Sequence, residues 1–139
     1  SVPNARRGQV RWARTRAKKI ARDMASANIY FRSLPSGRSL TALLNDRTIW
    51  INYDPTATEF GAQSVAHPHE IAVGPSAFRI GRWTVLATLI HELAHVNGAP
   101  GGGDQRAEQA LLHTGLGRWS EFGSGLDDPR TPYDPSISG

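Results

Sequence analysis

Residues 82–96 read RWTVLATLIHELAHV, and this stretch decides the fold. Its apolar residues recur at spacings of three and four, as in Leu86, Leu89, Ile90, Leu93 and Val96. That spacing places them on one broad face of a helix, and their density is typical of a buried one. Asn97 and Gly98 follow, and glycine favours the left-handed conformation that ends helices. The stretch therefore predicts a buried helix from residue 82 to residue 96.

The predicted helix carries the sequence His91-Glu92-Leu93-Ala94-His95. Residues four apart share a helix face, so His91 and His95 can bind one Zn²⁺ with Glu92 beside it. The chain has no cysteine, so histidine and carboxylate side chains are the ligands available for a metal. Zinc lowers the pKa of a bound water molecule, and a carboxylate can then take its proton. The motif predicts a catalytic zinc site with Glu92 as general base; a surface helix with two incidental histidines is the alternative.

A catalytic zinc site has three protein ligands, so a third is required. Where some families place a third histidine, this chain has Gly101. A second helix is predicted from Asp104, as N-cap, to the region of Gly115. An antiparallel hairpin of the two helices brings Glu108 level with His95, which makes Glu108 the predicted third ligand. Further candidates for this role are Asp104, Glu121 and His113.

Two strands are predicted before the helix at residues 82–96. They lie at residues 48–53 and 69–73, with a loop at residues 56–68 between them. An extended substrate can pair with a sheet edge, so we expect Ile71, Ala72 and Val73 to bind substrate. Tyr133 in the C-terminal tail is a catalytic candidate for stabilising an oxyanion, as is Tyr53; simple packing is the alternative. His67 and His69 are interpreted as exposed polar residues.

The N-terminal part of the chain is strongly basic. Residues 1–38 hold ten Lys and Arg against the single acid Asp23, a net charge of +9, while residues 39–139 carry −5. Apolar residues from Val10 to Ala27 recur at helical spacing, which predicts one amphipathic helix over residues 5–27. Its basic face is interpreted as solvated, since no base-reading motif is present to indicate specific nucleic-acid binding. No stretch is long enough to span a bilayer, and no signal peptide is evident.

The motif, the strand at residues 69–73 and Glu108 together resemble a zincin metallopeptidase of the gluzincin type. The resemblance implies an α+β, zincin-like fold: a small twisted sheet, the HExxH helix and a following helix with the third ligand. It also implies that His91, His95 and Glu108 bind Zn²⁺, that Glu92 is the base, and that the substrate is a protein or peptide. The interval from His95 to Glu108 is shorter than in many gluzincins.

The block at residues 71–103 is similar to metallopeptidase toxin domains at the C-termini of bacterial secreted effectors of the VgrG and Rhs kind. This resemblance implies a type VI secretion effector, delivered into the periplasm or cytoplasm of a target cell, and an immunity protein as a partner. The length predicts one domain over residues 1–139: a basic helix at 1–28, a catalytic core at 48–115 and a loop-rich tail at 116–139. The alternative is a basic module that binds nucleic acid or membrane and holds a structural zinc.

Overall fold

The computed structural model describes residues 2–64, 66–102 and 104–116. Within these ranges the chain is α+β, as predicted, with a small mixed sheet and six helices. The elements in chain order are α1 (Asn4–Asp23), α2 (Ala25–Ser33), α3 (Leu40–Leu44), β1 (Trp50–Tyr53), β2 (Gly61–Ser64), β3 (His67–Val73), α4 (Pro75–Ile80), α5 (Arg82–Val96) and α6 (Arg106–His113). None of the described helices is long and apolar enough to cross a membrane.

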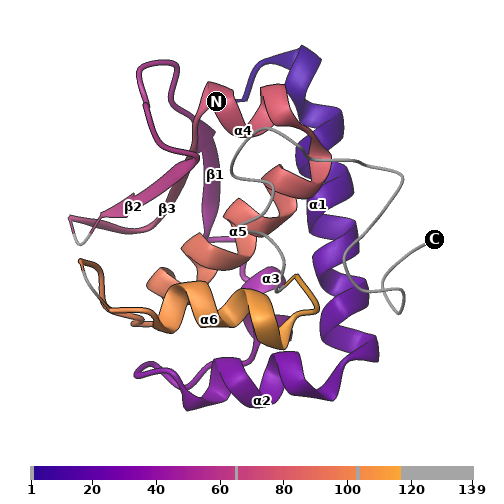
Figure 1. Ribbon diagram of the computed structural model, residues 1–139, viewed down its shortest axis with the longest axis vertical. Helices are drawn as coiled ribbons and strands as arrows, with labels where there is room; N and C mark the ends of the chain where they lie inside the picture. Colours follow the sequence, from indigo (N-terminus) through magenta and orange to yellow (C-terminus); the bar gives the residue numbers. More distant parts are fainter. Residues whose placement is uncertain (1, 65, 103, 117–139) are drawn as a thin grey trace.

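Helix α5 is the centre of the fold, and it has the predicted bounds. Every residue from Trp83 to Ile90 is buried, because the helix has neighbours on several sides. The sheet lies on one side of α5 and α1 on the other (Figure 1), while α6 packs beside its C-terminal half. Burial on several sides explains why most positions of this helix are apolar.

The basic N-terminal segment forms two helices, so the prediction of one continuous helix over residues 5–27 is wrong. The chain turns at Met24, whose φ of −116° and ψ of 102° are extended. Ala13, Ala17 and Ile20 are buried on α1 as the pattern predicts. After the turn α2 packs against α6, and Phe31 enters the core. The apolar spacing continues through Met24, so the local pattern does not reveal the break.

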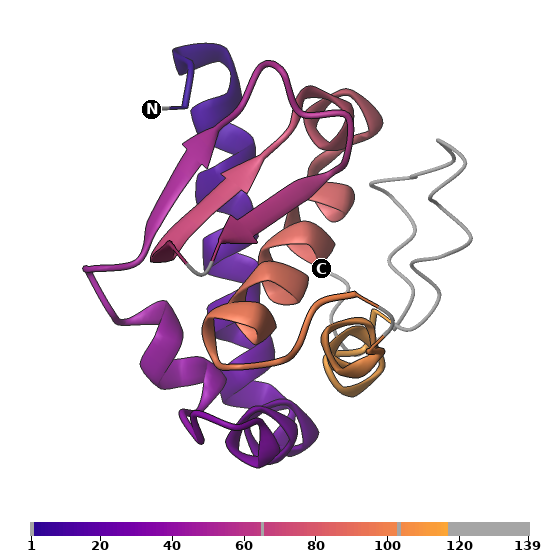
Figure 2. The same cartoon turned by 90° about the vertical axis from the view of Figure 1, so that its left-hand side faces the viewer.

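The sheet has the order β1-β3-β2, and Figure 2 views it from its outer side. Strand β1 is parallel to β3, with Ile51 opposite Ile71. Strand β2 is antiparallel to β3, with Ala62 opposite Ala72. The predicted loop at residues 56–68 therefore contains a strand. Its sequence GAQS has no apolar alternation, so nothing local predicts β2.

The end of α5 is held by a buried side chain. Asn97 is fully buried, and its amide donates to the carbonyl oxygens of Phe31 and Arg38, at 2.8 and 2.9 Å. Gly98 follows with φ +93°, the left-handed conformation predicted from its position after the helix. These contacts connect the end of α5, close to His95, to α2 and to the segment between α2 and α3.

Candidate metal centre

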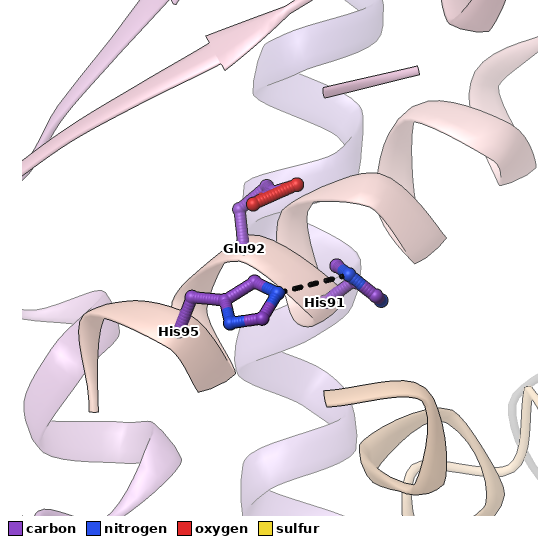
Figure 3. Close-up of side chains that lie close together, drawn as sticks. All are labelled: His91, Glu92 and His95. Atoms are coloured by element: carbon purple, nitrogen blue, oxygen red, sulfur yellow. Dashed lines mark hydrogen bonds between the residues drawn. The ribbon is translucent and has the colours of Figure 1, made fainter. Parts of the chain in front are cut away.

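Helix α5 carries His91, Glu92 and His95, whose side chains lie close together near its C-terminal end (Figure 3). The two histidines are one turn apart on a rigid buried helix, so the packing of α5 fixes where they project. Both histidines are partly buried, and Glu92 is only 4% exposed. Ligand atoms of these three side chains lie within 4.8 Å of one another, which makes them a group that could hold a metal ion.

The two imidazoles face each other through Nε2, and these atoms are 3.2 Å apart (Figure 3). Their outer nitrogens have other partners. Nδ1 of His91 lies 2.7 Å from Oε2 of Glu108, and Nδ1 of His95 lies 2.8 Å from the carbonyl oxygen of Ala99. A carbonyl and an ionised carboxylate only accept hydrogen bonds, so each Nδ1 is the nitrogen that carries the proton. In the neutral rings both Nε2 lone pairs then converge on one point.

Two lone pairs this close repel unless a cation or a proton lies between them. The spacing fits a metal ion: two nitrogens about 2.0–2.1 Å from one tetrahedral zinc are about 3.3–3.4 Å apart. The observed separation is 3.2 Å. Metal-binding histidines also characteristically donate their other N–H to a carboxylate or a backbone carbonyl, as His91 and His95 do here. The donor set therefore fits a metal ion held by the two Nε2 atoms.

Glu92 has an environment that suits proton transfer. Burial raises the pKa of its carboxyl to about 7, with the charge of Glu59 adding to the rise and that of His91 opposing it. A base with a pKa near neutrality can accept a proton and return it within one catalytic cycle. For His91, burial lowers the pKa, but the hydrogen bond to Glu108 and the charges of Glu92 and Glu108 raise it above its ordinary value.

Glu108 is brought to His91 by the α5–α6 hairpin, but it meets the outer nitrogen of the ring. In this position the carboxylate orients the imidazole and is not among the three side chains that converge. The sequence predicts that Glu108 binds the metal directly. Direct binding would require its carboxylate to leave Nδ1 of His91, so this role stays a prediction. The predicted N-cap Asp104 lies one residue before the cap position, where its carboxylate accepts from the backbone N–H of Arg106 at 2.9 Å.

The prediction that Ile71, Ala72 and Val73 form a sheet edge that binds substrate is wrong. These residues belong to β3, which is the central strand and pairs on both sides. In the part of the chain that the structure describes, the edge strand beside the metal group is β2. A Cβ at Gly61 would lie 2.5 Å from Cγ2 of Thr88 and 3.2 Å from Cγ of Glu92, so only glycine allows β2 so close to α5. Strand order cannot be derived from local sequence patterns, and this is why the edge was assigned to the wrong strand.

Two hollows flank the histidines. The first, of about 310 Å³, we call the acidic cavity; its wall comes from Glu59, Phe60, Ala87, Thr88 and Glu108. The second, of about 560 Å³, we call the glycine groove; it runs past Ala62, Pro68, Val96, Gly98 and Gly101. Both hollows also reach Gly61, His91 and Glu92, and Glu59 lines the groove as well as the cavity, so the metal group is open to a ligand from each hollow. The sequence alone did not single out Glu59 or Thr88, because neither belongs to a motif.

The remaining candidates lie away from the group or outside the described residues. His113 stacks on Tyr30, with ring centroids 4.3 Å apart, and Tyr53 packs against Phe78. His67 and His69 are exposed, as expected, and His69 lies 2.9 Å from the hydroxyl of Thr48. Tyr133 and Glu121 lie outside the described residues, as does the predicted tail from residue 117 onward.

Comparisons with protein-family models, with curated proteins and with solved structures found no match to this chain. Inference about its function therefore rests on the metal group and its surroundings.

Proposed function

We propose that this protein is a zinc-dependent metallopeptidase that hydrolyses a peptide or amide bond. The observation that carries the proposal is the convergence of the two Nε2 atoms at 3.2 Å beside a buried carboxyl whose pKa is raised to about 7. In this proposal His91 and His95 hold the metal, and Glu108 and the carbonyl of Ala99 orient their rings. A zincin-like fold is part of the same proposal.

A zinc ion held at this point supplies a Lewis acid that polarises a substrate carbonyl and acidifies a neighbouring water molecule. The chain's own contribution is proton transfer. Glu92 would accept the proton of the attacking water and return it to the leaving nitrogen. Because Glu92 is held by the same buried helix as the histidines, this transfer needs no rearrangement of the fold.

The position of β2 at the edge of the described sheet favours a substrate that binds in an extended conformation. A peptide can add to an exposed sheet edge through its backbone, and Gly61 places this edge against Glu92. The glycine groove continues from this position past Pro68 and Gly98. A peptide bound along β2 would therefore lie beside the metal group, in the glycine groove.

A structural zinc in a nucleic-acid- or membrane-binding module is less well supported. Such a site is closed by four protein ligands, whereas the described part of the chain offers the group of His91, Glu92 and His95, with hollows on both sides. His113, one of the further candidate ligands, is stacked on Tyr30. We further propose, on the resemblance of residues 71–103 alone, that the domain is a toxic effector neutralised by an immunity protein.

The test compares three proteins on a mixture of random-sequence peptides: the wild type, Glu92→Gln and Glu70→Gln. Glu70 is an exposed acid on β3 and serves as the matched control. We expect one zinc per chain in all three, with cleavage reduced about 10²- to 10⁴-fold in Glu92→Gln alone. Full activity of Glu92→Gln, or no cleavage by the zinc-loaded wild type, would contradict the proposal.

A further inference from the structure

The acidic cavity contains a carboxylate that the proposed mechanism does not use. Glu59 lies in the loop before β2, is exposed, and contributes to the wall of the cavity. Glu108 lies on α6 in the same wall, with 43% of its side chain exposed. The cavity reaches His91 and Glu92, so whatever occupies it lies next to the reacting bond. A carboxylate without a role beside the proposed reaction centre is a candidate for recognising substrate.

The rest of the cavity wall is apolar or accepts hydrogen bonds. Phe60 and Ala87 supply apolar surface. Thr88, also in the wall, is 4% exposed, and its hydroxyl has no hydrogen-bond partner among the described residues. No lysine or arginine belongs to the described lining. Lysine and arginine side chains combine an apolar stem with a head that only donates hydrogen bonds, which matches this wall.

Resting on the peptidase function proposed above, we propose that the acidic cavity is the subsite for a lysine or arginine side chain adjoining the bond that is cut. Glu59 is its specificity-determining residue, because its carboxylate has no hydrogen-bonding task within the metal group. Glu59 is exposed and belongs to the cavity wall, so its carboxylate is available to a cationic side chain whether or not a metal is bound by the two histidines.

The glycine groove has a different chemistry. Apart from Glu59 and Glu92, which it shares with the cavity, its wall is formed by histidines and by small or apolar residues such as Ala62, Pro68 and Gly101. Glu108 is the acidic residue that lines the cavity and not the groove, while Val96, Gly98 and Gly101 line the groove and not the cavity. The substrate class that fits is a peptide with a basic side chain in the cavity and small residues along the groove.

A binding experiment tests this subsite without requiring hydrolysis. Benzamidine and its uncharged relative benzamide are titrated calorimetrically into the wild type, Glu59→Gln and Glu70→Gln, each with and without zinc. We expect the wild type to bind benzamidine about tenfold more tightly than benzamide, as for a hydrogen bond between charged groups. Glu59→Gln should lose most of this preference, while Glu70→Gln, changed outside the cavity, should keep it. Equal binding of the two compounds by the wild type would overturn the proposal.

Peptide cleavage gives the second readout. On the random peptide mixture the wild type should enrich cuts beside lysine or arginine, and Glu59→Lys should shift the cuts towards acidic neighbours at unchanged zinc content. Cleavage with no basic preference, or a basic preference that survives Glu59→Lys, would contradict the subsite while leaving the peptidase function standing. Absence of any cleavage would contradict the peptidase function, and the benzamidine titration would still decide whether the cavity binds cations.

Discussion

Replacing Glu92 by glutamine should stabilise the metal-free protein at alkaline pH. Burial raises the pKa of this carboxyl from 4.5 to about 7, so the folded state holds a proton that the unfolded state releases. Between these two values the folded protein binds more protons, and its stability falls as the pH rises. Glutamine keeps the shape of the neutral acid and cannot ionise, so it removes this loss.

The magnitude follows from the size of the shift. A rise from 4.5 to about 7 corresponds to about 3 kcal/mol of stability lost by the wild type at pH 8. The difference between Glu92→Gln and the wild type should therefore be about 3 kcal/mol at pH 8 and should vanish below pH 4.5. Such a penalty is typical of functional groups, which are retained for activity at the expense of stability.

Urea denaturation of chelator-treated protein at pH 4.5, 6 and 8 measures this difference directly. Glu70→Gln serves as the control, because Glu70 is exposed and its carboxyl pays no burial penalty in the folded state. A gap that stays constant with pH would show that glutamine acts through packing and not through ionisation. A variant no more stable than the wild type at pH 8 would refute the reasoning.

The other predictions concern metal affinity, the sheet edge and toxicity. If Glu108 orients His91 through Nδ1, Glu108→Ala should weaken zinc binding about 10- to 100-fold in a chelator competition. Glu108→Gln still accepts that hydrogen bond, so it should weaken zinc binding distinctly less. Equal losses in the two variants would indicate that Glu108 binds the metal directly. Gly61→Ala should push β2 away from α5, at a cost of about 1–3 kcal/mol in thermal denaturation and with loss of peptidase activity. Gly8→Ala, on α1, where a Cβ meets nothing within 4 Å, should reduce neither stability nor activity. Expression in bacteria, directed to cytoplasm or periplasm, should arrest growth with the wild type and not with Glu92→Ala; equal growth in all four cultures would contradict the toxin proposal.

The sequence predicted best what depends on local periodicity. Helix α5 has its predicted bounds because apolar residues fill nearly every position between Trp83 and Ile90, and the glycine after it fixes the end. The hairpin that brings Glu108 to the histidines was also predictable, since a short connection between two helices favours an antiparallel arrangement, but it was expected to set Glu108 level with His95, and the carboxylate meets His91. Which nitrogen the carboxylate would meet depends on side-chain conformation, which the spacing does not specify.

Features set by distant contacts were missed. Strand β2 has no apolar alternation and forms because its backbone pairs with β3 while Gly61 fits against Thr88. The break at Met24 interrupts a continuous apolar pattern so that α2 can pack against α6. Glu59 belongs to no motif and becomes part of the site only because its loop leads into β2. In each case the deciding partner lies well away in the sequence.

The central claim is that His91 and His95 bind one zinc ion through Nε2. A crystal structure of zinc-loaded protein, with anomalous data collected on both sides of the zinc absorption edge, tests it most directly. The account predicts one strong anomalous peak about 2.0–2.1 Å from both Nε2 atoms, with Glu92 beside it and not bonded to it. A fully loaded protein whose zinc peak lies away from these two nitrogens would contradict it.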